Sequence, residues 1–248
     1  MIKIGIIGGS GLEDPDILKS PTELDIETKF GFPSSSLLEG SINGRDVIIL
    51  SRHGRKHTIP PTQVNNRANL LALKEAGCTH LLATTACGSL REEIGRGDLV
   101  IPDQFIDFTK HRQLTFFESF EAGKMKHTPM AEPFSSELRN ILISVSATIG
   151  QPVHPSGTIV TIEGPRFSTR AESRMFRAWG ADLVNMSTAP EVILANELGL
   201  PYASIAMSTD YDCWKENEDP VSWEEVLRVF ELNVQKVTFL IKSALTQI

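Results

Sequence analysis

Short, nearly continuous apolar runs alternate along the chain with longer stretches in which apolar residues recur every three or four positions. Short apolar runs of this kind predict strands, and their lack of polar alternation is typical of strands buried on both faces. The predicted strands are residues 2–7, 47–50, 80–84, 99–101, 153–162, 183–184 and 203–207. Strands separated by amphipathic helices predict an α/β sandwich with a largely parallel or mixed sheet.

Capping signals mark where the helices between these strands begin. Capping boxes, which pair a hydroxyl residue with an acid three positions later, are predicted at Thr169 with Glu172, Thr188 with Glu191, and Ser222 with Glu225. An earlier helix is expected to start at a Thr62 cap and to end at Gly77. The last helix carries apolar residues with a period near 3.6 as far as Leu245.

The sequence contains no internal repeat, low-complexity tract or linker, so residues 1–248 are expected to form a single domain. Residues 107–133 lack periodicity and contain four phenylalanines. A loop of this length inside a compact domain is usually functional or interfacial, and we expect one of these roles here.

Composition narrows the choice of partners. The net charge of −7 argues against a nucleic-acid backbone or an anionic membrane as the main partner, so any bound anion must be held by local, convergent donors. Three cysteines without paired or metal-site spacing predict reduced thiols. With no secretory signal pattern and no apolar run near 18 residues, a cytoplasmic protein is expected.

Two carboxylates follow the predicted strand at 203–207. Asp210 and Asp212 are two positions apart, and continued strand alternation would point both to one side. Two adjacent acids in an apolar setting repel each other, and one of them can retain a proton at neutral pH. Such a pair can accept a hydrogen bond from an amino group and donate one to a ring nitrogen, as the edge of adenine requires. The alternative is that both are helix caps or turn residues.

Four other clusters of hydrogen-bond donors also follow predicted strands, where open α/β sheets bind ligands. They are Gly8-Gly9-Ser10-Gly11, Arg52-His53, residues 84–89 and residues 185–188. Singly, each could be an ordinary turn or a surface charge, and the glycine turn fits neither a dinucleotide fingerprint nor a P-loop. Together they predict phosphate on one side of the site, held by Arg forks and a helix N-terminus, and a nitrogenous base on the other.

Three longer segments resemble family signatures: residues 86–93, 162–168 and 209–214. With them, the chain is similar over nearly its whole length to the trimeric branch of the purine nucleoside phosphorylase family. The resemblance implies an α/β sandwich whose central mixed sheet is partly barrel-like and flanked by helices. It also implies phosphorolysis of S-methyl-5'-thioadenosine with no metal or organic cofactor, by a homo-oligomer that is a trimer or a dimer of trimers.

The resemblance assigns roles residue by residue. Phosphate is assigned to Ser10, Arg52, His53, Thr85, the Ala86 amide and Ser187. The nucleoside is assigned to Phe167, Met186, Asp210, Tyr211, Asp212 and His127. Among these, Asp210 is the implied acid that protonates the purine N7, and His127 is implied to reach the 5'-substituent in a neighbouring subunit.

Two further positions bear on specificity. Family members that act on 6-oxopurines carry Glu at position 168 and Asn at position 210, where this chain has Ser168 and Asp210. Asp210 favours a 6-amino group over a 6-oxo group, and a buried mismatch costs about 1–3 kcal/mol. Trp223 stands where a smaller Val is common, which leaves the 5'-substituent open between methylthio and hydroxyl.

Two other functions remain open at this point. Water could replace phosphate, giving hydrolysis, although the Ser10, Arg52 and Ser187 cluster argues against it because water needs no such cradle. A nucleotide-binding module without chemistry has only the glycine turn in its favour, and no acidic ribose ligand follows about 20 residues later.

Overall fold

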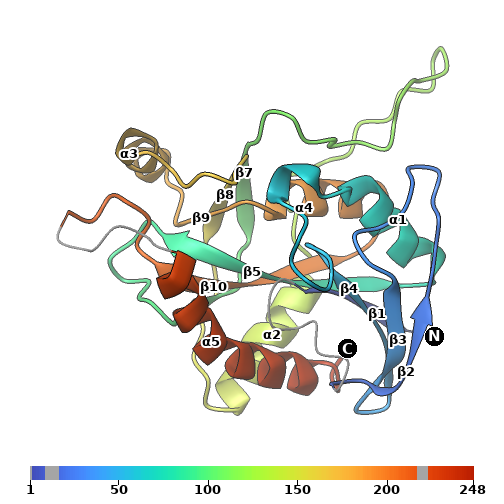
Figure 1. Ribbon diagram of the computed structural model, residues 1–248, viewed down its shortest axis with the longest axis horizontal. Helices are drawn as coiled ribbons and strands as arrows, with labels where there is room; N and C mark the ends of the chain where they lie inside the picture. The colour runs from blue at the N-terminus through green and yellow to red at the C-terminus, as the bar shows by residue number, and fades with distance from the viewer. Residues whose placement is uncertain (1, 9–16, 217–222) are drawn as a thin grey trace.

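The computed structural model describes residues 2–8, 17–216 and 223–248, with ten strands joined in one mixed sheet (Figure 1). The strands are β1 (Lys3–Gly8), β2 (Lys19–Leu24), β3 (Leu37–Ile42), β4 (Arg45–Ser51), β5 (His80–Ser89), β6 (Leu99–Val100), β7 (Gln104–Phe108), β8 (Thr158–Ile162), β9 (Leu183–Asn185) and β10 (Tyr202–Asp210). The α-helices are α1 (Asn66–Glu75), α2 (Ser136–Thr148), α3 (Arg170–Ala178), α4 (Thr188–Glu197) and α5 (Trp223–Ala244).

Strand β5 lies at the centre of the sheet. The first half of β5 pairs in parallel with β1, its end pairs antiparallel with β9, and β10 runs parallel along its other edge. The path through the sheet is β2-β3-β4-β1-β5-β9-β8-β7, with β6 antiparallel to β10. Because β1, β4, β5 and β10 are parallel, their carboxyl ends meet at one edge. The open mixed sheet with flanking helices confirms the predicted fold class.

Alternate residues of the central strands face two different cores. Ile6 and Ile49 belong to the core that includes α2 and α5, whereas Ile7 and Ile48 belong to the core that includes α1 and α4. Figure 1 shows these two helix pairs on opposite faces of the sheet. The side-chain period of two therefore explains the continuous apolar runs, since residues 4–8 of β1 and 47–51 of β4 are all buried on one face or the other.

The helix after the predicted Thr62 cap starts later than expected. Thr62 lies in a 3-10 turn (Pro61–Gln63), and Asn65 caps α1 by accepting from the Ala68 amide at 3.1 Å. Proline at the start of this turn fixes its backbone and moves the helix start beyond it. The predicted end is confirmed, because Gly77 follows the helix with a positive φ of 87°.

The capping boxes have different outcomes. Thr169 and Glu172 form both bonds of the predicted box at the start of α3. The prediction for Thr188 and Glu191 is wrong, because Ser187 is the N-cap residue without a side-chain capping bond and the Glu191 carboxylate binds an arginine instead. The Ser222 cap lies outside the described residues.

Four elements were not predicted: β2, β3, β7 and α2. The edge strand β2 reads KSPTEL and is largely exposed, so it carries no apolar signal. Helix α2 contains several serine and β-branched residues that weaken its helical pattern, although Ser135 does cap it. The predicted strand at 153–162 is shortened, since β8 begins only at Thr158.

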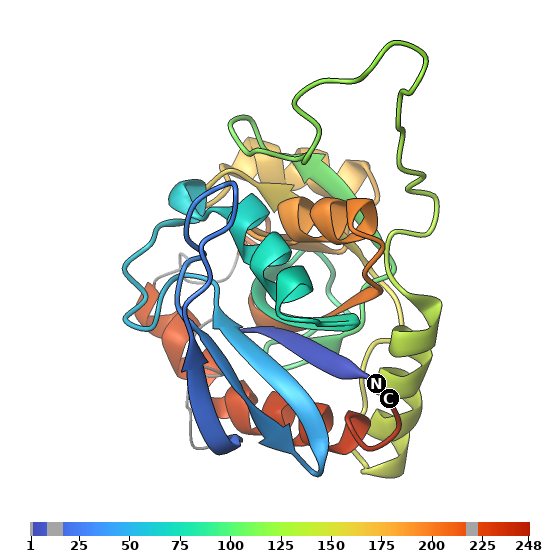
Figure 2. The ribbon, with the colours of Figure 1, turned by 90° about the vertical axis from the view of Figure 1, so that its right-hand side faces the viewer.

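Residues 109–135 link β7 to α2 without a helix or strand, as expected for this aromatic segment. We call residues 109–133 the projecting segment, because Figure 2 shows it in green extending away from the rest of the chain. Across the described ranges, no helix has the length and apolarity that crossing a bilayer requires.

Candidate active site

The predicted site residues gather at the carboxyl ends of parallel strands. Arg52 directly follows β4, and its amide donates to the Gly8 carbonyl oxygen at the end of β1 at 2.9 Å. Thr85 lies in the second half of β5, and Asp210 ends β10. Residues 9–16 are not described, so the predicted role of Ser10 stays a prediction.

Arg52 is held rigidly inside the protein. It is 2% exposed, and its Nε and Nη2 donate to the two carboxylate oxygens of Glu191, which is 1% exposed. Its Nη1 donates to the Thr84 carbonyl oxygen at 2.9 Å. Burial acts to lower the Arg52 pKa, but the Glu191 charge and hydrogen bonds outweigh it and raise the pKa, so the guanidinium stays charged. Three of its five N–H groups serve these bonds, and the other two can bind a ligand.

Glu191 and Tyr202 complete this buried network, and sequence reasoning missed both. The Tyr202 hydroxyl donates to Glu191 Oε2 at 2.9 Å, and burial raises the Tyr202 pKa well above its ordinary value. The signal for Glu191 was present: it is the only charged residue among positions 188–196, in the first turn of an apolar helix. A buried acid in such a setting needs a cationic partner.

His53 lies beside Arg52 as a neutral ring. Its Nδ1 is 2.9 Å from the Ile59 carbonyl oxygen, which can only accept, so Nδ1 carries the proton. Burial and then the Arg52 charge lower the His53 pKa to about 4. At neutral pH the other ring nitrogen, Nε2, is therefore an acceptor. His53 adds no positive charge here, but it can accept a hydrogen bond from a protonated anion.

The hydroxyls of Thr85 and Ser187 lie 3.1 Å apart, so the structure brings together the predicted donor clusters at 84–89 and 185–188. Residues 84–89 do not follow a strand as predicted, because β5 extends to Ser89. Thr85 and Ser187 are both buried, and Ser187 stands at the N-terminus of α4. Ala86 follows Thr85 in β5. A helix N-terminus and two hydroxyls provide uncharged donors suited to an anion.

The two acids are adjacent and buried, but for a different reason than predicted. Asp210 ends β10, whereas Asp212 lies in a turn with a positive φ of 49°, so strand alternation does not set its direction. The Asp212 amide donates to Asp210 Oδ1 at 2.7 Å. Gly88 makes room for the pair, since a Cβ there would lie 2.9 Å from Asp210 Oδ1.

Burial shifts the pKa values of both acids. It raises the Asp210 pKa from 3.8 to about 6, and the Asp212 charge adds to the rise, while the Thr209 hydroxyl and the Asp212 amide oppose it. Burial also raises the Asp212 pKa, against the nearby hydroxyls of Ser173 and Ser168. Both serine hydroxyls are buried and face Asp212, and neither has another partner within the described residues. Asp210 is thus able to exchange a proton near neutral pH.

Other predicted ligand residues surround the acid pair less tightly. Phe167 is 42% exposed, on the loop that contains Ser168. Met186 lies against Gly164 of this loop, where a Cβ would come within 2.5 Å of its sulfur. The Tyr211 ring makes an edge contact with Trp214. The Trp223 side chain is outside the described residues.

The loop that carries Phe167 is anchored at Glu163. The Glu163 carboxylate accepts from Arg112 Nε at 2.9 Å and from the amides of Lys110 and His111 at 2.7 and 3.1 Å. These bonds hold the Glu163 pKa below its ordinary value despite partial burial. They tie the loop to the start of the projecting segment.

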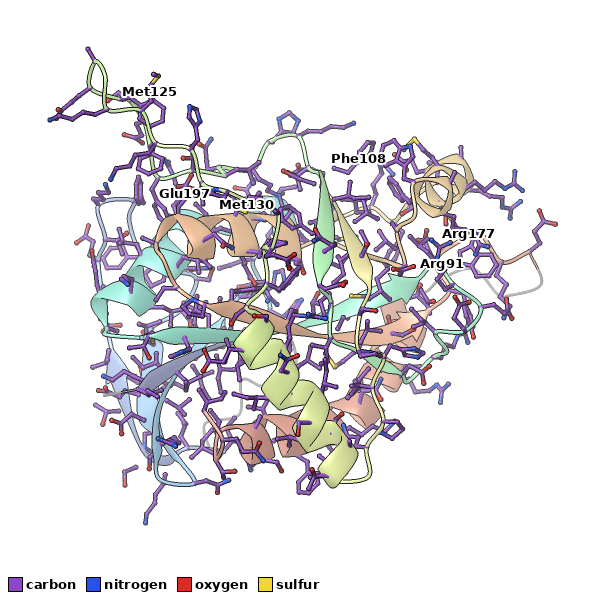
Figure 3. The ribbon with its side chains drawn as sticks, turned by 180° about the vertical axis from the view of Figure 1, so that it is seen from behind. Arg91, Phe108, Met125, Met130, Arg177 and Glu197 are labelled. Carbon is purple, nitrogen blue, oxygen red and sulfur yellow. The ribbon has the colours of Figure 1, made fainter. Side chains whose placement is uncertain are left out.

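His127 lies on the projecting segment, apart from the other predicted residues. It is exposed and lines a cavity of about 380 Å³ together with Met130 and Glu197. Figure 3 shows Met125 far out on this segment and Met130 beside Glu197. Glu197 ends α4, whereas Ser187 precedes its first residue, so the ten-residue helix separates Glu197 from the anion donor Ser187 by about 15 Å.

Within the described part of the chain, no three His, Cys, Asp or Glu side chains gather as metal ligands. The arrangement instead places a fixed cation, neutral donors and a buried acid pair with raised pKa values at the same edge of the sheet.

Comparisons with known proteins agree with this arrangement. The chain matches the sequence model of the Phosphorylase superfamily over residues 3–246. The S-methyl-5'-thioadenosine phosphorylase of Danio rerio is 56% identical over 249 residues, covering 100% of this chain and 89% of that protein.

Two solved structures from Schistosoma mansoni are similar throughout. Its methylthioadenosine phosphorylase in complex with adenine has a TM-score of 0.94 at 45% identity, covering 100% of this chain and 92% of that one. A mutant of its adenosine/methylthioadenosine phosphorylase, in complex with methylthioadenosine, has a TM-score of 0.92 at 44% identity, covering 100% and 91%. The chain therefore belongs to the phosphorylase superfamily.

Proposed function

We propose that this protein catalyses the reversible phosphorolysis of S-methyl-5'-thioadenosine to adenine and 5-methylthioribose 1-phosphate. The observation that carries the proposal is that one edge of the sheet carries both a buried, charged Arg52 guanidinium and a buried Asp210 carboxyl whose pKa is raised to about 6. The relatives from Danio rerio and Schistosoma mansoni bear the name of this activity.

On the anion side, phosphate would be bound by the two remaining Arg52 N–H groups, the Thr85 and Ser187 hydroxyls and the Ala86 amide, with Ser10 as a further donor. His53 would accept the proton of hydrogen phosphate at Nε2, because its Nδ1 proton is committed to Ile59. Fixed donors of this kind hold the nucleophile in line with C1' without reorganising during the reaction.

On the base side, protonated Asp210 would donate to N7 while Asp212 accepts from the 6-amino group. The bond between C1' and N9 then breaks, and its electron pair leaves with the base, which departs as neutral adenine protonated at N7. A phosphate oxygen forms the new bond to C1', and Asp210 is left ionised until it regains a proton from solvent. A carboxyl with a pKa of about 6 suits this proton transfer at neutral pH.

Ser168 would support the choice of a 6-aminopurine. Its hydroxyl lies beside Asp212, and it offers no carboxylate to the N1–H of a 6-oxopurine. Met186 would pack against the ribose, Phe167 and Tyr211 beside the nucleoside, and Trp223 near the 5'-substituent. The mechanism uses no metal or organic cofactor.

We also propose a homo-oligomer, either a trimer or a dimer of trimers. His127 would bind the 5'-substituent in a neighbouring subunit, which fits its distance from the anion donors of its own chain. A cytoplasmic location would suit the three free thiols of Cys78, Cys87 and Cys213.

The test is a comparison of four nucleosides with and without phosphate. Methylthioadenosine and adenosine should release adenine only when phosphate is present, and methylthioinosine and inosine should react at least tenfold more slowly. Cleavage at the same rate without phosphate would instead establish hydrolysis. Equal rates for the inosine compounds would contradict the assigned roles of Ser168 and Asp210.

A further inference from the structure

A chain of hydrogen bonds runs from the first turn of α4 to the Thr85 hydroxyl. The Ala189 amide donates to Thr161 Oγ1 at 3.0 Å, and the Thr161 hydroxyl donates to Asn185 Oδ1 at 2.8 Å. Asn185 Nδ2 then donates to Thr85 Oγ1 at 3.0 Å and, on a second branch, to Thr188 Oγ1 at 2.6 Å. All five residues are buried.

The sheet places these groups side by side. Thr161 and Asn185 are partners in the parallel register of β8 and β9, next to one another in Figure 1. Strand β9 in turn pairs with the end of β5 at Gly88 and Ser89, three and four residues beyond Thr85. Thr161 is fully buried, and its hydroxyl joins the Asn185 amide to the Ala189 amide of α4, so we expect it to influence a bound anion through these two groups and not by direct contact.

Donor and acceptor roles fix the direction of the chain. A backbone N–H can only donate, so one lone pair of Thr161 Oγ1 accepts from Ala189. The single hydroxyl proton of Thr161 is donated to the oxygen of Asn185. This orients the Asn185 amide with its NH₂ group toward Thr85. Because Thr85 Oγ1 accepts from Asn185, its own proton is directed out of the network.

We propose that Asn185 is a positioning residue that keeps the Thr85 hydroxyl a hydrogen-bond donor toward phosphate. This inference rests on the proposed function. With the amide reversed, Thr85 would donate to the Asn185 oxygen and would present only lone pairs to the anion, which repel it. Within the protein, the Thr85 hydroxyl donates to the Ala86 carbonyl oxygen at 3.2 Å and lies 3.1 Å from the Ser187 hydroxyl, a pair in which either oxygen can be the donor.

A matched pair at Thr161 tests the relay at a distance from the ligand. Thr161→Val keeps the shape but removes the hydroxyl, so Asn185 loses its orienting bond. Thr161→Ser keeps the hydroxyl and loses only a methyl group. We expect the phosphate KM to rise about tenfold in the Val variant, as for the loss of one oriented hydrogen bond, and at most twofold in the Ser variant. The nucleoside KM should stay within twofold in both. Equal phosphate KM values in the two variants, or a parallel rise in the nucleoside KM, would overturn the proposal.

A second variant covers the case in which Thr161→Val does not fold. Asn185→Asp is isosteric, but an ionised carboxylate can only accept, so Thr85 would turn its proton inward. The phosphate KM should rise more than tenfold at pH 8 and should fall as the pH is lowered and the new carboxyl gains a proton. A rise that does not change with pH would contradict the relay.

Calorimetric titration with inorganic phosphate separates this inference from the proposed function. If the wild-type protein binds phosphate but cleaves no methylthioadenosine, the proposed function fails while the relay is still tested by binding. In that case the phosphate Kd should follow the same order, with Thr161→Val about tenfold weaker than Thr161→Ser. Equal Kd values would overturn the relay alone.

Discussion

The two halves of the site bury charge in opposite ways. On the anion side, Arg52 remains charged because Glu191 neutralises it through a two-bonded ion pair. On the base side, Asp210 has no cation bound to it in the described network, and burial instead raises its pKa to about 6. An ion pair keeps its charge at any working pH, whereas a buried acid near its pKa can release and regain a proton. The first arrangement suits holding a ligand, and the second suits acid catalysis.

A second difference separates the residues assigned to the chemistry from those assigned to the base and the 5'-substituent. Arg52, Thr85 and Asp210 lie in or directly after buried strands of one sheet. Phe167 and His127 lie on loops, and both are exposed. Groups on rigid elements keep the precise geometry that chemistry requires, while loops can vary with the substituent that they contact.

The largest expected effect comes from removing the proton donor of the base side. Asp210→Asn should lower kcat/KM for methylthioadenosine by about 10²–10⁴, because the amide cannot protonate N7. The melting temperature should not fall, since the variant removes a buried acid whose ionised form is disfavoured. Steady-state assays and a thermal melt measure both. Activity within tenfold of wild type would refute the assigned role.

A smaller effect is expected on the anion side. Glu191→Ala leaves the Arg52 charge buried without its partner and should destabilise the protein by about 3–5 kcal/mol, with a raised phosphate KM. Tyr202→Phe is the matched control: it removes a single hydrogen bond to Glu191 and should cost about 1 kcal/mol. Urea unfolding distinguishes the two variants. Equal losses of unfolding free energy in the two variants would show that the Arg52–Glu191 ion pair does not stabilise the anion side.

These contrasts show what the sequence could and could not predict. Continuous apolar runs identified the central strands, because burial on both faces leaves a strong local signal. The positions of Arg52 and Asp210 followed, since ligands bind where parallel strands end. The edge strand β2 was missed because an exposed strand carries no such signal.

The partners of the site residues were the part that local patterns could not supply. Glu191 fits a capping box three residues after Thr188, but its carboxylate binds Arg52, which lies 139 positions away along the chain. Likewise, the bond between Thr161 and Asn185 depends on the register of β8 and β9. Tertiary contacts of this kind decide which of several local roles a polar residue takes.

The smallest expected effect is a change in the pH dependence of stability, and it tests both halves together. Asp210 has its pKa raised from 3.8 to about 6, so its contribution to stability is present at low pH and is lost as the pH rises through this window, by at most ~3 kcal/mol. His53 has its pKa lowered from 6.5 to about 4, so its contribution is present at neutral pH and is lost as the pH falls through nearly the same window. Because the His53 ring is only partly buried, we expect about 2 kcal/mol from it.

In the wild-type protein, Asp210 and His53 change the stability with pH in opposite directions, and single variants should reveal each contribution. Asp210→Asn leaves His53 unopposed, so the free energy of unfolding should be higher at pH 6.5 than at pH 4.5, by about 2 kcal/mol. His53→Gln leaves Asp210 unopposed, and the order should reverse. Urea unfolding at the two pH values measures both, and the comparison cancels groups common to the variants, such as Glu172 with its pKa lowered to about 2. If the free energy of unfolding changed with pH in the same direction in both variants, burial would not favour deprotonated His53 and protonated Asp210 as described. The contrast between the halves would then rest on the Arg52 ion pair alone.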